Sequence, residues 1–140
     1  MDKQKLISQL ELEEGCLIRL YNDTQGIPTI GIGRNLRDTG VSKEEAYYLC
    51  SNDIDRIVNA LQSDIPQFNS LDDVRQRVLV DIAFNVGVSG LLLFKNMLSA
   101  ISVGNWQDAH DQLLNSLAAR QAPNRYNRLA QMLLTGQDAV

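Results

Sequence analysis

The sequence predicts an α+β fold that is mainly α-helical, and two patterns predict it. Residues 17–33 hold two short β-prone runs on either side of a turn cluster at residues 22–26, which is typical of a β-hairpin. From residue 42 onward, apolar residues recur at intervals of three and four, the period of an amphipathic helix. With 140 residues, the chain can bury a core without disulfides or a structural metal. We therefore expect one domain with a hairpin lobe followed by a helical lobe.

The first half of the chain carries clear helix signals. Leu6, Ile7 and Leu10 fall on one side of a first helix. Ser42 and Glu45 form a capping box at the start of a connecting helix. The expected segments are a first helix at 1–13, a hairpin small lobe at 14–41, a connecting helix at 42–65 and a helical lobe at 66–140.

Caps and glycines divide the helical lobe into several helices. Ser70 is expected to cap the first of them, and Gly87 and Gly90 are expected to interrupt it. The remaining expected boundaries are a cap at Asn105, a helix continuing from it through Leu117, and a last helix that starts at Pro123 and stops at Gly136.

The second run of the hairpin, residues 27–33, alternates in a way that predicts a ligand face. Side chains of a strand alternate between its faces, so Thr29, Gly31 and Gly33 share one face, and Ile30 and Ile32 share the other. If the isoleucines sit on a core, the open face carries a hydroxyl and two glycines. Glycines in a strand often mark close approach by a ligand. A groove between the hairpin and the helices is then the natural binding site.

The composition excludes several kinds of chemistry. The 13 basic and 17 acidic side chains give a net charge of −4, which argues against a nucleic-acid partner. One histidine, His110, and two cysteines, Cys16 and Cys50, cannot supply a zinc site of Cys and His ligands alone. We expect both cysteines to be reduced, buried apolar residues. Carboxylates remain the most plausible catalytic groups.

No segment has the pattern of a secretory signal or of a membrane span. We therefore expect synthesis in a cytoplasm and no stable membrane association.

Glu14, Asp23 and Thr29 form the most informative constellation. Glu14 follows the first helix, Asp23 lies in the hairpin turn, and Thr29 lies on the expected open face. Hydrolysis of a glycosidic bond needs one acid to protonate the leaving oxygen and a second group to direct water or stabilise positive charge. Spacing alone leaves another interpretation open, in which Glu14 is a surface acid and Asp23 forms an Asx-turn.

Several segments of the chain resemble one known family. The pattern Glu-x8-Asp-x5-Thr runs from Glu14 to Thr29 and is followed by a glycine-rich segment. The later matching segments, in order, are Ser70-Leu71-Asp72, Val74-Arg75, Phe84, Gly87, Gly90, Phe94, Asn96, Leu98, Trp106, Ala109 and Gln121-x-Pro123-Asn124-Arg125. Together they resemble the phage-type lysozymes of glycoside hydrolase family 24, the endolysins and muramidases of the T-even phage type, over nearly the whole chain. The resemblance implies a lysozyme-like fold with an active-site cleft between its two lobes.

The resemblance also implies catalytic roles. Glu14 would be the general acid, Asp23 would position or activate the attacking water, and Thr29 would hold that water by a hydrogen bond. The family's reaction inverts the anomeric carbon, for which carboxyl groups ~6.5–9.5 Å apart are expected. Glu13 is the rival acid. On a helical wheel Glu14 lies nearer the apolar side of the first helix, so we expect it to be the less solvated of the two.

Three supporting residues follow from the same resemblance. Arg125 matches the family arginine that pairs with the catalytic glutamate and ties the lobes together, although a surface arginine is the alternative interpretation. Arg34 stands where the family usually has a histidine, and Asp53 is its expected ion-pair partner. The residues expected to contact substrate are Gly31, Gly33, Asn85 and Gln112.

The implied function is that of an endolysin. It would hydrolyse the β-1,4 bond between N-acetylmuramic acid and N-acetylglucosamine in peptidoglycan, with no metal and no organic cofactor. We expect a monomer that stays in the host cytoplasm until a separate membrane-permeabilising protein, a holin, releases it to the cell wall. The alternatives are a non-catalytic peptidoglycan-binding descendant and a transglycosylase that leaves anhydro-muropeptides. Because residues 118–140 carry three arginines and one aspartate, we expect a basic cluster of Arg120, Arg125 and Arg128 to border the groove and attract substrate.

Overall fold

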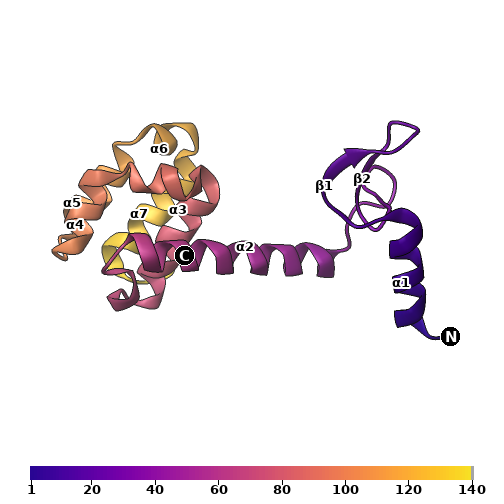
Figure 1. The fold of residues 1–140 in the computed structure, drawn as a ribbon. Helices are drawn as coiled ribbons and strands as arrows, with labels where there is room; N and C mark the ends of the chain where they lie inside the picture. The colour runs from indigo at the N-terminus through magenta and orange to yellow at the C-terminus, as the bar shows by residue number, and fades with distance from the viewer. Residues whose placement is uncertain (140) are drawn as a thin grey trace. The chain divides into compact units, whose positions relative to one another are not determined.

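The computed structural model describes residues 1–139, and its elements confirm the α+β, mainly helical fold class (Figure 1). The chain divides into two compact units, Met1–Leu49 and Cys50–Val140. The predicted single domain with a cleft between its lobes stays a prediction. The elements of the first unit are α1 (Lys3–Glu14) and an antiparallel sheet of β1 (Leu17–Asn22), β2 (Pro28–Gly31) and β3 (Arg34–Asn35), in the order β1-β2-β3; α2 (Lys43–Asp64) then crosses into the second unit.

The first helix forms as predicted and ends one residue later. The Asp2 side chain caps it by accepting the Lys5 N–H at 3.0 Å. Gly15 terminates it with φ +75°, a left-handed value that suits glycine. No α1 side chain is fully buried, and Ile7 and Leu10 of the predicted apolar side are exposed within the first unit.

The predicted alternation along the second strand is wrong. β2 ends at Gly31, because Gly31 and Gly33 adopt φ of +68° and +66° and turn the chain into β3. Thr29 is 4% exposed, whereas the expected open face would have exposed it. Ile30 and Ile32 are half-buried. The central position of β2, paired with β1 through Tyr21↔Thr29 and with β3, accounts for the burial of Thr29.

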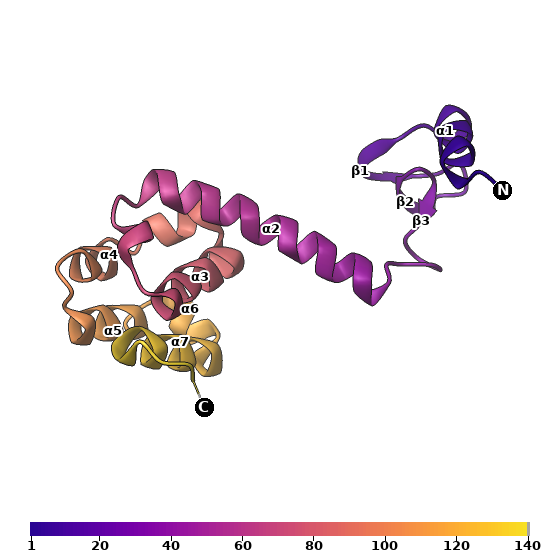
Figure 2. The same cartoon turned by 90° about the horizontal axis from the view of Figure 1, so that it is seen from below.

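The second unit is a helical bundle with one continuous apolar core (Figure 2). Its core includes large side chains from α2, α3, α4, α5 and α7, among them Leu61, Leu79, Met97, Leu113 and Tyr126. The further elements are a 3₁₀ turn at Phe68–Ser70, α3 (Asp73–Leu92), α4 (Lys95–Ser102), α5 (Trp106–Leu114), α6 (Leu117–Gln121) and α7 (Pro123–Thr135).

Within residues 1–139, no single helix combines the length and apolarity of a membrane span; α3 and α4 meet those two criteria only as a pair bent by 95°.

Some predicted boundaries are confirmed. Ser42 Oγ accepts the Glu45 N–H at 3.1 Å, as expected for a cap. Asn105 caps α5 through the Asp108 N–H at 3.1 Å, and α7 begins at Pro123. These signals are local in sequence, so they are readable without the tertiary structure.

Other predicted boundaries are wrong. Ser70 lies in the 3₁₀ turn, and Asp72 caps α3 instead, by accepting the Arg75 N–H at 3.2 Å. Gly87 does kink α3, with φ +82°, but Gly90 continues the helix. Leu117 belongs to a separate helix, α6.

The two cysteines also differ from expectation. Cys16 and Cys50 are free, as expected, but both are exposed within their own units rather than buried.

Arg75 fastens the C-terminal end of α7. Its Nε donates to the Leu133 carbonyl at 2.8 Å and its Nη2 to the Leu134 carbonyl at 3.0 Å. The guanidinium lies 3.8 Å from the ring centroid of Trp106, and its side chain is only 13% exposed. The last carbonyls of a helix have no partner within the helix, so Arg75 satisfies groups that would otherwise need water.

Arg75→Ala is expected to lower the free energy of unfolding by about 2 kcal/mol, because it leaves these carbonyls without donors. Arg77→Ala is the control on the same helix, since Arg77 pairs with Asp73 and Asp138 at the surface. It is expected to cost about 0.5 kcal/mol or less. Urea unfolding measures both, and equal losses would contradict the role assigned to Arg75.

Candidate active site

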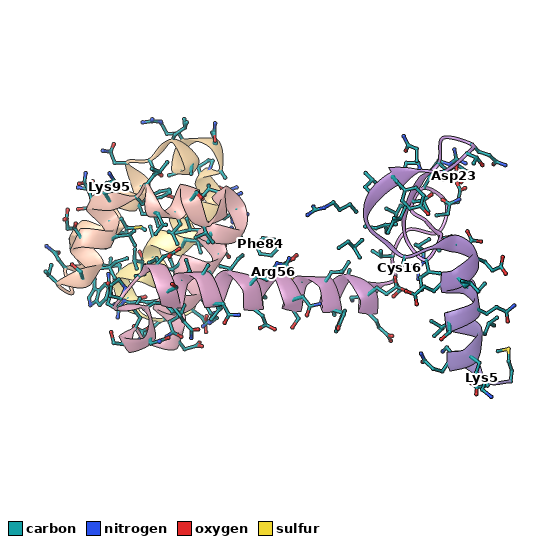
Figure 3. All side chains as sticks on the ribbon, in the orientation of Figure 1. Lys5, Cys16, Asp23, Arg56, Phe84 and Lys95 are labelled. Carbon is teal, nitrogen blue, oxygen red and sulfur yellow. The ribbon has the colours of Figure 1, made fainter. Side chains whose placement is uncertain are left out.

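Asp23 is oriented by the loop that joins β1 and β2 (Figure 3). Its Oδ1 accepts the N–H of Gln25 at 2.8 Å and the N–H of Ile27 at 2.9 Å. This is the Asx-turn that the alternative interpretation foresaw, and it does not compete with a catalytic role. One carboxylate oxygen fixes the loop, while Oδ2 accepts no hydrogen bond from residues 1–139.

Thr29 is oriented by the same loop. Its hydroxyl donates to the Ile27 carbonyl at 2.8 Å. The hydroxyl proton is therefore used in this hydrogen bond, and the lone pairs of the Thr29 oxygen can accept a hydrogen bond from another donor.

Ile27 is the residue that sequence reasoning missed. Its N–H donates to Asp23, and its carbonyl accepts from both the Asp23 N–H at 3.0 Å and the Thr29 hydroxyl. One residue's backbone thus orients two predicted catalytic side chains. The only available sequence signal was the Asx-turn pattern that begins at Asp23.

Glu14 is brought against Gly33. A Cβ at Gly33 would lie 3.3 Å from Glu14 Oε2 and 3.4 Å from Cδ. Glycine at this position therefore leaves the space that the Glu14 carboxyl group uses. Glu13 and Glu14 are both exposed within the first unit, so the expected difference in solvation between them stays a prediction.

Arg34 forms an ion pair within the first unit that the sequence did not predict. Its Nη1 donates to Glu45 Oε2 at 2.6 Å and to the Gly40 carbonyl at 3.1 Å, and its Nη2 donates to Glu45 Oε1 at 3.2 Å. Asp53, the expected partner, lies in the second unit and accepts from Arg56 three residues later on α2, and its pairing with Arg34 stays a prediction. Glu45 lies on the first turn of α2, within reach of the β3 end of the sheet. Hydrogen bonding to Arg34 holds the pKa of Glu45 below its usual value.

Arg125 bridges two helices of the second unit. Its Nε and Nη2 donate to Asp81 Oδ1 at 2.8 and 2.6 Å, which links α7 to α3. Asp81 was not singled out from the sequence. The expected pairing of Arg125 with Glu14 stays a prediction.

Asn85 is held by a buried tyrosine. The Tyr126 hydroxyl donates to Asn85 Oδ1 at 2.8 Å, and burial raises the pKa of Tyr126. With Oδ1 occupied, the amide N–H donors of Asn85 remain free for a ligand.

Gln112 lines a groove of about 440 Å³ in the second unit. Three further amide side chains line the same groove, those of Asn96, Asn115 and Gln121. The structure therefore brings polar amides together around Gln112, while Asn85 is not among the lining residues.

Within residues 1–139, no three His, Cys, Asp or Glu side chains are close enough to hold a metal ion.

Comparison with known proteins identifies the family. A model of the phage lysozyme family matches residues 11–128. The chain belongs to the phage lysozyme family. Membership makes it an enzyme, a glycoside hydrolase of lysozyme type, as the resemblance of its motifs predicted.

Relatives of this lysozyme occur in different settings. It is similar to a probable T4-type lysozyme of Dictyostelium discoideum, with 26% identity over 91% of this chain and 92% of the relative. It is also similar to the endolysin of Salmonella phage P22, with 28% identity over 77% of each chain. The pre-baseplate central spike protein of Enterobacteria phage T4 is 30% identical over 94% of this chain, which spans only 28% of the length of that protein.

The ion pair of Arg34 and Glu45 predicts a pH dependence of stability. Because the folded pKa of Glu45 is lowered, the pair stabilises the fold fully above the ordinary glutamate value of 4.5, and this contribution is lost as the pH falls through the folded value. The difference in Tm between the wild type and Glu45→Gln is therefore expected to be constant well above the ordinary glutamate value of 4.5 and to shrink as the pH falls through the lowered folded value.

Glu44→Gln is the control, since Glu44 precedes Glu45 on α2 and forms no ion pair among residues 1–139. Thermal unfolding followed by circular dichroism across this pH range makes the comparison. A Glu45→Gln difference that stays undiminished down to the lowest pH at which the wild type is folded would contradict the assignment.

Proposed function

We propose that this lysozyme is an endolysin-type muramidase that hydrolyses the β-1,4 bond between N-acetylmuramic acid and N-acetylglucosamine with inversion. The observation that carries the proposal is the shared anchoring of Asp23 and Thr29 on the Ile27 backbone, in a chain of the phage lysozyme family. That anchoring leaves two acceptors, Asp23 Oδ2 and Thr29 Oγ1, for one water molecule.

A water that donates one proton to Asp23 Oδ2 and the other to Thr29 Oγ1 has a lone pair free to attack. Thr29 can only accept in this arrangement, because its own proton is given to Ile27. Asp23 then takes the water proton as the general base while the new C–O bond forms. Thr29 has no adjacent base that would make it a nucleophile, which favours direct attack by water.

Glu14 serves as the general acid in this proposal and protonates the leaving glycosidic oxygen. Its support is the contact with Gly33, which places its carboxyl group against the turn between β2 and β3. Glu13 has no comparable support.

The second unit supplies polar groups for the sugars. Tyr126 holds Asn85 through its oxygen, the Asn85 amide N–H groups donate to no partner among residues 1–139, and Gln112 lies in a groove rich in amides. Such donors suit the carbonyl oxygens of N-acetyl groups. Gly31 and Gly33 would let a sugar approach the backbone of the turn closely.

The biological setting follows from the endolysin relative. The proposal includes action on the bacterial cell wall by a monomer, with a separate holin that releases the enzyme. A transglycosylase is the alternative that the products would reveal, since they would end in an anhydro sugar.

Glu14→Gln is expected to reduce hydrolysis of purified peptidoglycan by at least about 100-fold, because the leaving oxygen loses its proton donor. Glu13→Gln is the matched control and is expected to retain most activity. Mass spectrometry of the released muropeptides distinguishes reducing ends from anhydro ends, which are lighter by one water. Full activity of Glu14→Gln would reject the acid assignment, and anhydro ends would reject hydrolysis.

Gly33→Ala is expected to impair catalysis beyond its effect on stability. The left-handed φ should cost about 1–2 kcal/mol, and the new methyl group should displace the Glu14 carboxyl group. Gly104→Ala, at φ +69° with open space around the new Cβ, carries the same backbone strain without a neighbour. We expect similar losses of stability from both, with a turnover that is lower by on the order of three- to tenfold only for Gly33→Ala. Equal turnover in the two variants would argue against the contact.

A further inference from the structure

The short strand β3 links the predicted catalytic residues. It has two residues, Arg34 and Asn35, and pairs with Ile30 and Thr29 of β2. Arg34 also directly follows Gly33, whose backbone lies against Glu14. A two-residue strand has little pairing energy of its own, so its position depends on what else holds it.

The Arg34 side chain fixes the position of β3. Its planar guanidinium donates three hydrogen bonds, two to the Glu45 carboxylate and one to the Gly40 carbonyl. Glu45 is in turn fixed on α2, whose first turn is capped by Ser42. The capped start of α2 is therefore connected through two side chains to the backbone beside Glu14 and Thr29.

We propose that Arg34 and Glu45 are positioning residues for the hydrolysis proposed above. The pair holds Gly33 against Glu14 and β3 against Thr29. Neither side chain touches the reacting atoms; each acts through the backbone of the turn and β3. The proposal rests on the proposed function and extends it to two residues whose pairing the sequence did not predict.

The surroundings of the pair make a positioning role separable from a stabilising one. Arg34 and Glu45 are 39% and 44% exposed at their side chains, and they line a groove of about 600 Å³ in the first unit. Exposed ion pairs contribute little to stability, so variants that lack the pair should fold. A large fall in kcat, measured well below the Tm of the variant, would then reflect displaced active-site residues rather than unfolding.

The same groove offers a matched control. Glu44 lines it beside Glu45 and carries the same charge, but it does not bond to Arg34. Alanine at either position removes one carboxylate from the same turn of α2.

The test measures kcat and KM on soluble peptidoglycan strands for the wild type, Arg34→Ala, Glu45→Ala, the double variant and Glu44→Ala. We expect kcat to fall about tenfold in each single variant of the pair, with KM within about twofold of the wild type. The double variant should be no slower than either single variant, because both substitutions break the same connection. Glu44→Ala should keep the wild-type kcat.

Each outcome decides between the proposals. If the wild type releases no muropeptides, the proposed function fails. If the wild type is active but Glu45→Ala keeps its kcat, or if the two losses multiply in the double variant, the positioning role alone is overturned. Amide NMR shifts of Gly33 and Thr29 give an independent readout: they should move in Arg34→Ala and Glu45→Ala but not in Glu44→Ala, and unmoved shifts would also overturn the role.

Discussion

The backbone of Ile27 is the constraint on which the chemistry of the first unit depends. Its N–H and carbonyl take part in three hydrogen bonds with Asp23 and Thr29. Thr29 is the sole fully buried residue among residues 1–49, so apolar packing does little to fix this loop within its own unit. Hydrogen bonds contribute about 1 kcal/mol each, and three that meet at one residue fix side-chain directions more effectively than they add stability. The orientation therefore depends on the main chain at position 27 and not on the isoleucine side chain.

In the second unit, apolar packing between helices, rather than hydrogen bonding at one backbone residue, holds the structure together. Its helices bury a continuous apolar core, which supplies most of its stability. Polar side chains then fix how the helices join. Arg75 satisfies the carbonyls at the end of α7, Arg125 joins α7 to α3 through Asp81, and Tyr126 orients Asn85 from within the core. A rigid helical scaffold of this kind can hold an amide side chain in one orientation, which a substrate-binding role requires.

Local signals in the sequence predicted local structure well, and the failures have physical causes. Asn105 and Pro123 mark helix starts by chemistry confined to one turn. The cap predicted at Ser70 was wrong because Asp72, two residues later, caps α3 instead. The predicted alternation of side chains was wrong because Gly31 and Gly33 adopt positive φ and end β2. The periodicity of apolar residues in the sequence does not reveal such backbone angles. The partner of Arg34 was missed because Glu45 is 11 residues away, and only the folded turn brings the two together. The role of Ile27 had no side-chain signature at all.

The contact with Gly33 adds a geometric argument to the choice between Glu13 and Glu14. Both glutamates are exposed within the first unit, so the expected difference in their solvation stays a prediction. Adjacent helical residues project about 100° apart, so only one of the two can face a given neighbour. Gly15 ends α1 directly after Glu14 and directs the chain into β1, and the Glu14 carboxyl group then meets Gly33 at the turn before β3. The distinction thus comes from two glycines, one that ends the helix and one that leaves space for the carboxylate. Steric fit to Gly33 is the structural support for the proposal that Glu14 is the general acid.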